Sequence, residues 1–335
     1  MKIIQNKKQP KGFWAKLPKP FFALAPMSDV TDMAFRQIIA KYSEHGKTTG
    51  GPDVFWTEFV SCDGLCSVGG KHMLRDLKYN KKEKPIVAQV FGSNPNTFYK
   101  TAQIIKKLGF DGIDINIGCP DRKIEKQGAG AALIKNPKFA TEIIYATKEG
   151  SGNMPVSVKT RIGYNKNQIE EWIPALLETN IDALIIHART RKEMSLVPAK
   201  WEYIARVARL AKNTNTMIIG NGGIKTLEEG QQKAQETGAD GIMVGCGVFG
   251  NPWLFNSKVS YKDIPLTTRL KVLIEHTKLF EKKLGDIKNF AIMKKHFKAY
   301  ITGFDGTKEL RTKLMETNNS KEVERVIKTY VNSLL

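Results

Sequence analysis

One cysteine in the sequence, Cys119, has the surroundings of a catalytic side chain. It follows Gly112–Ile117, where isoleucines alternate with polar residues in the period of an extended strand, and it stands between Gly118 and Pro120, which end that pattern. Cys119 is therefore expected at the carboxyl end of a strand, the edge at which parallel α/β folds assemble their ligand sites. A buried structural thiol is the alternative, because cysteine is among the most often buried residues.

Five more polar side chains stand at or just beyond the ends of short apolar runs, where parallel strands would present them to one edge. Any one of them has a structural interpretation, such as a capping asparagine or a satisfied core histidine. The interior of a barrel is otherwise filled by branched apolar side chains, so six polar residues at equivalent positions indicate a shared site. The six are Gln89, Asn116, Cys119, Lys159, His187 and Asn221.

Eight β-prone runs carry or precede these residues, and helical periodicity follows most of them. A strand-then-helix unit repeated over residues 20–257 predicts an α/β fold, the (β/α)8 TIM barrel, whose usual length is about 250 residues. Helical periodicity alone then predicts a smaller C-terminal all-helical domain at 258–335. The runs are 21–26, 54–57, 85–90, 112–117, 155–159, 183–187, 216–219 and 241–244, and the expected helices include 33–42, 96–108, 137–148, 168–178, 201–211 and 227–237.

The ends of the last two strands are rich in glycine. Ile219-Gly-Asn-Gly-Gly-Ile224 and Gly245-Cys-Gly247 place exposed backbone N–H groups where barrels bind phosphate. Lys159 suits an electron-rich ring such as a flavin, although an ion pair with Asp114 would also explain it. His187-Ala-Arg-Thr-Arg191 adds guanidinium groups that favour an anionic or nucleobase ligand.

Basic residues dominate the charge of the chain. The formal net charge of +20 favours a polyanionic partner if the charge gathers on one face, although a uniformly basic proteome would give the same total. Residues 1–19 contain lysines and no acidic residue, which predicts a basic N-terminal arm. The expected helical domain carries many basic residues, among them Lys294, Lys295 and His296, and a long positive face suits phosphate contacts.

Cysteine usage and hydropathy predict a cytoplasmic protein. The four cysteines are irregularly spaced, no leader-like apolar run is present, and no stretch approaches the roughly 18 to 20 apolar residues of a membrane span. Cys62 and Cys66 lack a second pair of ligands nearby, so no metal is expected. We expect a monomer.

Ordered strings of the sequence resemble the tRNA-dihydrouridine synthase family. They continue from the expected barrel into the expected helical domain, so the resemblance covers most of the chain. The strings are 25–32 with Phe35 and Arg36, 89–92, 114–120, 128–130, 158–161, 187–191, 220–223, 293–297, Tyr300, 303–304 and 310–311.

The resemblance implies an FMN-dependent enzyme that uses NADPH to reduce the C5–C6 double bond of specific uridines in tRNA to dihydrouridine. It implies that flavin N5 delivers hydride to C6 while Cys119 protonates C5 as the general acid. Asn116 and Arg189 would orient the extruded base, and Lys294 and Lys295 would bind the RNA. FMN would be held by Pro26, Met27, Gln89, Lys159, His187, Asn221, Gly222, Gly223, Gly245 and Cys246.

Two positions depart from the family pattern, and other functions stay open. Cys246 stands where the family commonly has arginine, and Gly223 replaces an acidic residue that often follows Gly-Asn-Gly, so both changes affect the expected phosphate site. The alternatives are a dihydrouridine synthase of rRNA, an FMN-dependent oxidoreductase of a free pyrimidine, and a non-catalytic RNA-binding protein. The sequence does not predict which uridine is reduced.

Overall fold

The computed structural model describes residues 11–48 and 50–333, and a parallel sheet closed into a barrel is its centre. The strands are hydrogen-bonded in the order β1-β9-β8-β7-β6-β5-β4-β2, and a parallel bridge between Ala23 and Val54 joins the two ends. This confirms the eight predicted strands, and it adds one short strand, β3, which pairs with β4. The bounds are β1 Phe21–Leu24, β2 Phe55–Trp56, β3 Val60–Ser61, β4 Ile86–Phe91, β5 Gly112–Ile117, β6 Val156–Arg161, β7 Ala183–His187, β8 Met217–Asn221 and β9 Gly241–Val244.

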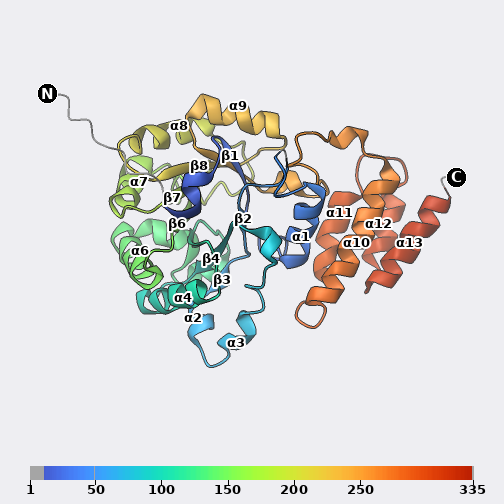
Figure 1. Ribbon diagram of the computed structural model, residues 1–335, viewed down its shortest axis with the longest axis horizontal. Coiled ribbons are helices and arrows are strands. Elements are labelled where there is room, and N and C mark those ends of the chain that lie inside the picture. The colour runs from blue at the N-terminus through green and yellow to red at the C-terminus, as the bar shows by residue number, and fades with distance from the viewer. Residues whose placement is uncertain (1–10, 49, 334–335) are drawn as a thin grey trace.

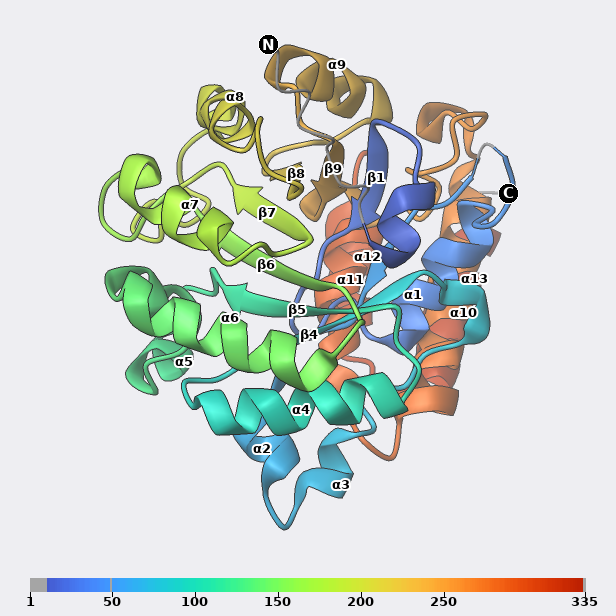
Figure 2. The ribbon, with the colours of Figure 1, turned by 60° about the vertical axis from the view of Figure 1, so that its left-hand side comes forward.

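Helices alternate with these strands and cover the outside of the barrel (Figure 2). Local sequence explains their limits: the side chains of Asp32, Asn136 and Thr226 accept backbone N–H groups at three of the N-termini, and Gly238 ends a helix in the left-handed conformation at φ 73°. The predicted helices 33–42 and 227–237 have the observed bounds. The helices are α1 Met33–Tyr42, α2 Cys62–Cys66, α3 Gly70–Met73, α4 Pro95–Lys107, α5 Arg122–Lys126, α6 Pro137–Ser151, α7 Ile169–Glu178, α8 Trp201–Leu210 and α9 Leu227–Thr237.

Four C-terminal helices pack together on the side of the barrel where α1 lies (Figure 1). Their apolar side chains form a core that includes Ala34 and Ile38 of α1 and Trp253, while Phe35 and Ile39 of α1 belong to the barrel core. Helix α1 therefore joins the two parts of the molecule through both of its faces. In the ranges that the structure describes, no helix is long and apolar enough to cross a membrane. The four are α10 Leu266–Leu284, α11 Met293–Tyr300, α12 Thr307–Met315 and α13 Ser320–Asn332.

The amino-terminal end of the barrel is filled by a tryptophan from the segment predicted as a basic arm. Residues 1–10 of that segment lie outside the described residues. Gly12–Lys16 form a short 3-10 helix, and Trp14 is buried with its ring 5.8 Å from Phe21 and 6.1 Å from Trp56, centroid to centroid. Burial of a large aromatic ring contributes stability by the hydrophobic effect, so Trp14 closes the interior opposite the predicted site.

Candidate active site

A cavity of about 730 Å³ opens at the carboxyl ends of the barrel strands. Its volume is typical of small-molecule and cofactor sites, which span about 300 to 1,000 Å³. The structure places all thirteen barrel residues predicted to act in catalysis or binding on its wall, while Lys294 and Lys295 of α11 lie elsewhere. The thirteen are Pro26, Met27, Gln89, Asn116, Cys119, Lys159, His187, Arg189, Asn221, Gly222, Gly223, Gly245 and Cys246.

Cys119 is positioned by a turn that ends β5. The side-chain oxygen of Asn116 accepts the backbone N–H groups of Gly118 at 3.1 Å and Cys119 at 2.9 Å, which closes an Asx turn. Gly118 passes close to β6, since a Cβ there would lie 3.3 Å from Thr160 Cα, and its carbonyl accepts Arg161 Nε at 2.8 Å. The main chain that carries the thiol is therefore held from both sides.

A fully bonded polar network lies beneath this turn. The buried Asp114 carboxylate accepts Gln89 Nε2 and Ser157 Oγ, both at 2.6 Å, and Gln89 Oε1 accepts Asn116 Nδ2 at 2.9 Å. Burial raises the pKa of Asp114 to about 6, against the lowering effect of the bonds from Gln89 and Ser157. The amide oxygen and the amide nitrogen of Asn116 and of Gln89 are all bonded, so neither side chain is free to rotate. The network therefore fixes the orientation of the Cys119 turn.

Lys159 does not pair with Asp114 in the described chain. Its Nζ instead donates to Asn221 Oδ1 at 3.1 Å, and Asn221 Nδ2 donates to the carbonyl of Met243 at 2.8 Å. The alternative of a structural Lys159–Asp114 ion pair is therefore not the observed arrangement. Burial, and then the neighbouring Arg161, lower the pKa of Lys159 to about 8.

Cations and a neutral imidazole form the wall next to Lys159. Burial lowers the pKa of Arg161 to about 10, and burial followed by Arg161, Lys159 and Arg189 lowers the pKa of His187 well below its usual value. Arg189 Nη1 lies 3.0 Å from His187 Nε2, and because arginine can only donate, Nε2 is the acceptor and the ring proton sits on Nδ1. This wall donates hydrogen bonds and positive charge, which suits an electron-rich ring.

The thiol of Cys119 is held in its protonated form. Burial is the largest effect and raises its pKa, while Arg161 and Lys159 act in the opposite direction. A protonated thiol can give up a proton, and the nearby cations would stabilise the thiolate that remains. Cys119 thus has the properties of a general acid and lacks those of a resting nucleophile.

Glycine backbone forms the part of the cavity wall after β8 and β9, beside His187. Gly222 and Gly223 have φ values of 130° and 81°, which favour glycine, and Trp201 Nε1 donates to the Gly222 carbonyl at 3.0 Å. A Cβ at Gly222 would lie 3.1 Å from Ala199 Cβ and 3.2 Å from His187 Cδ2. A donor-rich wall suited to the ring and bare glycine backbone suited to the phosphate, both in one cavity, fit a flavin nucleotide.

Several cavity residues were not predicted as site residues. Arg161 could have been found, because it follows Lys159 by two positions and therefore points to the same face of β6. Lys225 follows the glycine turn closely, but a lysine at the start of a helix has no distinctive signal. Tyr261 and Thr302 reach the cavity from the C-terminal region, and only the tertiary packing reveals them.

Lys295 has a partner on the barrel. Its half-exposed Nζ lies 3.2 Å from Asp29 Oδ2, and Lys288 Nζ, far less exposed, lies 2.6 Å from Glu58 Oε2. Glu58 also accepts the backbone N–H of Asp29 at 2.6 Å. These bonds connect the loop after β1 to the C-terminal helices, so Lys295 has a structural contact in addition to its predicted role in RNA binding.

Sulfur and carboxylate side chains do not gather into a metal site in the described residues. Cys62 is buried, and burial raises its thiol pKa. Cys66 Sγ lies 3.6 Å from the carbonyl of Thr97. Both cysteines are therefore part of the packing between α2 and α4.

Comparison with known proteins assigns the family. The family described as "Dihydrouridine synthase (Dus)" matches residues 23–334. A "Probable tRNA-dihydrouridine synthase" of Staphylococcus aureus (strain MRSA252) is 39% identical over 322 residues, 95% of each chain, and "Probable tRNA-dihydrouridine synthase 2" of Bacillus subtilis (strain 168) is 38% identical over 330 residues, 97% of this chain and 98% of the relative.

A solved structure supports the fold independently. The histamine dehydrogenase from Rhizobium sp. 4-9 superposes with a TM-score of 0.51 at 12% identity, over 77% of this chain and 48% of that one. A likeness at this identity concerns the barrel fold alone. The sequence match, which extends from the first barrel strand through the C-terminal helices, shows that the chain belongs to the dihydrouridine synthase family.

Proposed function

We propose that this protein reduces the C5–C6 double bond of specific uridines in tRNA, with FMN as its cofactor and NADPH as electron donor, in the cytoplasm. The observation that carries the proposal is the protonated Cys119 thiol on the wall of the same cavity as a donor-rich wall and a glycine-backbone end. Membership of the dihydrouridine synthase family supports the reaction, and the names of the relatives support tRNA as substrate.

Two groups of residues on the cavity wall would hold FMN. Lys159, His187 and Gln89 would bond the ring, and the backbone at Gly222, Gly223, Gly245 and Cys246 would bond the phosphate. FMN, once reduced by NADPH, supplies the hydride that is added to C6 of uracil.

Cys119 would complete the reduction by donating its proton to C5. Charge develops on the C5 side of uracil as C6 gains hydride, and a thiol positioned there quenches it as a general acid. Asn116 holds the backbone N–H of Cys119, so the acid is preorganised before the base arrives. Arg161 and Lys159 would stabilise the resulting thiolate until water restores its proton.

The rest of the RNA would rest on the basic C-terminal helices. A uridine in a folded tRNA must leave its stack to reach a cavity at the end of a barrel, and phosphate contacts from lysines compensate that cost. Lys294 and Lys295 on α11 are the proposed contacts, and Arg189 at the cavity wall would bond the extruded base.

The test is dihydrouridine formation on purified RNA that lacks the modification. Protein with FMN and NADPH is incubated with tRNA or with rRNA, and the nucleosides are analysed by mass spectrometry. We expect product on tRNA and a loss of about 10²-fold or more in turnover for Cys119→Ala, with FMN still bound. Cys66→Ser, on α2 away from the cavity, is the matched control.

Three outcomes would contradict parts of the proposal. Equal turnover for Cys119→Ala would exclude its role as the acid. Product on rRNA alone would reassign the substrate. Flavin reduction by NADPH with no product on either RNA would favour a reductase of a small molecule.

A further inference from the structure

Lys225 gives the glycine end of the cavity a positive charge. We propose that its ammonium group binds the phosphate of FMN and sets the preference for FMN over uncharged riboflavin. The inference rests on the proposed function, because it names the contact made by one part of the proposed cofactor. It adds a residue that neither the sequence motifs nor the predicted cofactor contacts include.

The backbone fixes where Lys225 starts. Gly222 and Gly223 turn the chain after β8, Ile224 is buried, and Lys225 follows directly before Thr226, the N-cap of α9. The backbone N–H of Lys225 donates to Glu229 Oε2 at 2.7 Å, and the Thr226 hydroxyl accepts the Glu229 N–H at 3.1 Å. These bonds anchor the main chain of Lys225 beside the glycine turn.

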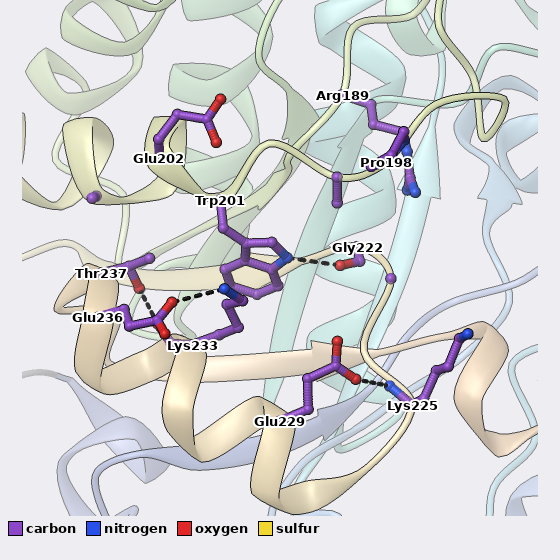
Figure 3. A pocket seen from close by; sticks show the side chains of 13 residues that line it. Arg189, Pro198, Trp201, Glu202, Gly222, Lys225, Glu229, Lys233, Glu236 and Thr237 are labelled. Atoms are coloured by element: carbon purple, nitrogen blue, oxygen red, sulfur yellow. Dashed lines mark hydrogen bonds and ion pairs between the residues drawn. The ribbon is translucent and has the colours of Figure 1, made fainter.

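The side chain leaves this anchor in the direction of the cavity. Figure 3 shows it running away from the Glu229 carboxylate, which bonds only the backbone of Lys225. The figure is centred on a second hollow of about 760 Å³ between α8 and α9, and Lys225 lies on the boundary between this hollow and the 730 Å³ cavity. Its ammonium group can therefore reach a ligand at the glycine end.

The other cations of the cavity wall already have hydrogen-bond partners within the protein. Lys159 Nζ bonds Asn221 at 3.1 Å, Arg161 bonds the carbonyls of Gly118 and Thr190, and Arg189 Nε bonds the carbonyl of Val197 at 2.6 Å. Within residues 11–48 and 50–333, no carboxylate pairs with Lys225 Nζ. Its charge is therefore available to a ligand.

Arg189 is the other positive side chain beside Gly222 and Gly223, and its Nε and Nη1 already bond Val197 and His187. Cys246, which follows the turn after β9, is neutral and exposed. Helix α9 cannot supply the missing charge alone, because Glu228 and Glu229 occupy its first turn and offset the helix dipole. A phosphate dianion bonded by the backbone of Gly222, Gly223, Gly245 and Cys246 thus has Lys225 as its counter-charge. Lysine is a common ligand of phosphate groups.

The experiment compares two flavins that differ only by the phosphate. Flavin is removed from the full-length protein, and FMN and riboflavin are titrated back with flavin fluorescence as the signal. For Lys225→Met we expect FMN to bind about 10- to 100-fold more weakly, as for a lost charge-assisted hydrogen bond, with riboflavin affinity unchanged. Lys225→Arg should retain most of the FMN affinity.

Lys233→Met is the matched control, because Lys233 lines the neighbouring hollow and pairs with Glu236 at 2.7 Å. Unchanged FMN affinity in Lys225→Met would overturn the inference and leave the proposed function intact. An equal loss of FMN and riboflavin would also overturn it, since the effect would then not depend on phosphate. If the unaltered protein bound neither flavin, the proposed function would fail together with the inference.

Discussion

Two groups of buried polar side chains in this molecule are bonded in opposite ways. Below the cavity, Asp114, Gln89 and Asn116 satisfy one another at 2.6 to 2.9 Å. Between α10 and α11, the rings of His276 and His296 lie 4.6 Å apart, and none of their four nitrogens has a hydrogen-bond partner in the described chain. All five side chains are buried, so the two groups differ in their hydrogen-bond partners and not in exposure to water.

The difference shows what each region is built to do. A satisfied network has one low-energy arrangement and can therefore orient Cys119, whereas unpartnered imidazoles cost stability without fixing anything. The histidine rings instead act as packing surface, since Phe35 lies 5.4 Å from His276 and 4.9 Å from His296 between ring centroids. The first region orients the turn that carries Cys119, and the second attaches the C-terminal helices to α1.

The largest effect is expected from breaking the bonded network at Asn116. Asn116→Ala releases the backbone N–H of Cys119 and should lower kcat by about 10²-fold, the usual result of misplacing a catalytic group by about 1 Å. Ser157→Ala is the control, because it removes a bond to Asp114 without touching the Cys119 turn. Measured kcat, KM and FMN affinity would separate the two, and an unchanged kcat for Asn116→Ala would show that Cys119 is positioned by other groups.

Asp114 should make stability fall as pH rises. Burial raises its folded pKa to about 6 from a model-compound value of 3.8, so its contribution is fully present below about pH 4 and is lost as pH rises to about 6. The shift corresponds to about 3 kcal/mol at ~1.36 kcal/mol per unit. Urea unfolding of the protein and Asp114→Asn at pH 4 and pH 7 measures it, and parallel pH profiles would contradict the raised pKa.

The histidine pair should make stability change with pH in the opposite direction. Burial lowers the pKa of His296 to about 3 and that of His276 well below its usual value, so both rings resist protonation when folded. Stability is therefore complete above about pH 6.5 and falls as pH drops below it, by about 2 kcal/mol for His296 at pH 5.

The variant His296→Phe isolates this dependence. It should lose less stability than the unaltered protein between pH 7.5 and pH 5 in urea unfolding, because an apolar ring of similar shape has no proton to gain. His72→Gln, at an exposed position of α3, is the control for removing a histidine elsewhere in the chain. Equal pH dependence of His296→Phe and the unaltered protein would show that the buried pair does not control it.

The sequence predicts the features of these regions that depend on neighbouring residues, and it does not predict contacts between distant parts of the chain. Period-two alternation and glycine or proline at its end located β5 and Cys119, because both depend on neighbouring residues. The side-chain partners of Asn116 and Lys159, Gln89 and Asn221, lie on other strands, and no local pattern specifies them. His296 stands among lysines and is predicted as part of a basic face, yet it is fully buried, because it shares the inward face of α11 with Met293, Phe297 and Tyr300. The burial of Trp14 is likewise not predicted, because this residue stands in a segment whose charges are all positive.

Lys295 should have the smallest effect on stability. Its bond to Asp29 is half exposed, so Lys295→Ala should cost less than about 1 kcal/mol of folding stability, measured by urea unfolding.

The charge reversal Lys294→Glu with Lys295→Glu should instead weaken tRNA binding by about tenfold or more and change its salt dependence, because lysine contacts to phosphate release counterions. Lys106→Glu with Lys107→Glu, an exposed pair in the last turn of α4, is the matched control. If both pairs weakened binding equally, the effect would come from total charge, and α11 would not be the docking surface. A loss confined to 294 and 295, with flavin reduction by NADPH intact, would place the RNA on the helices that the histidine pair attaches.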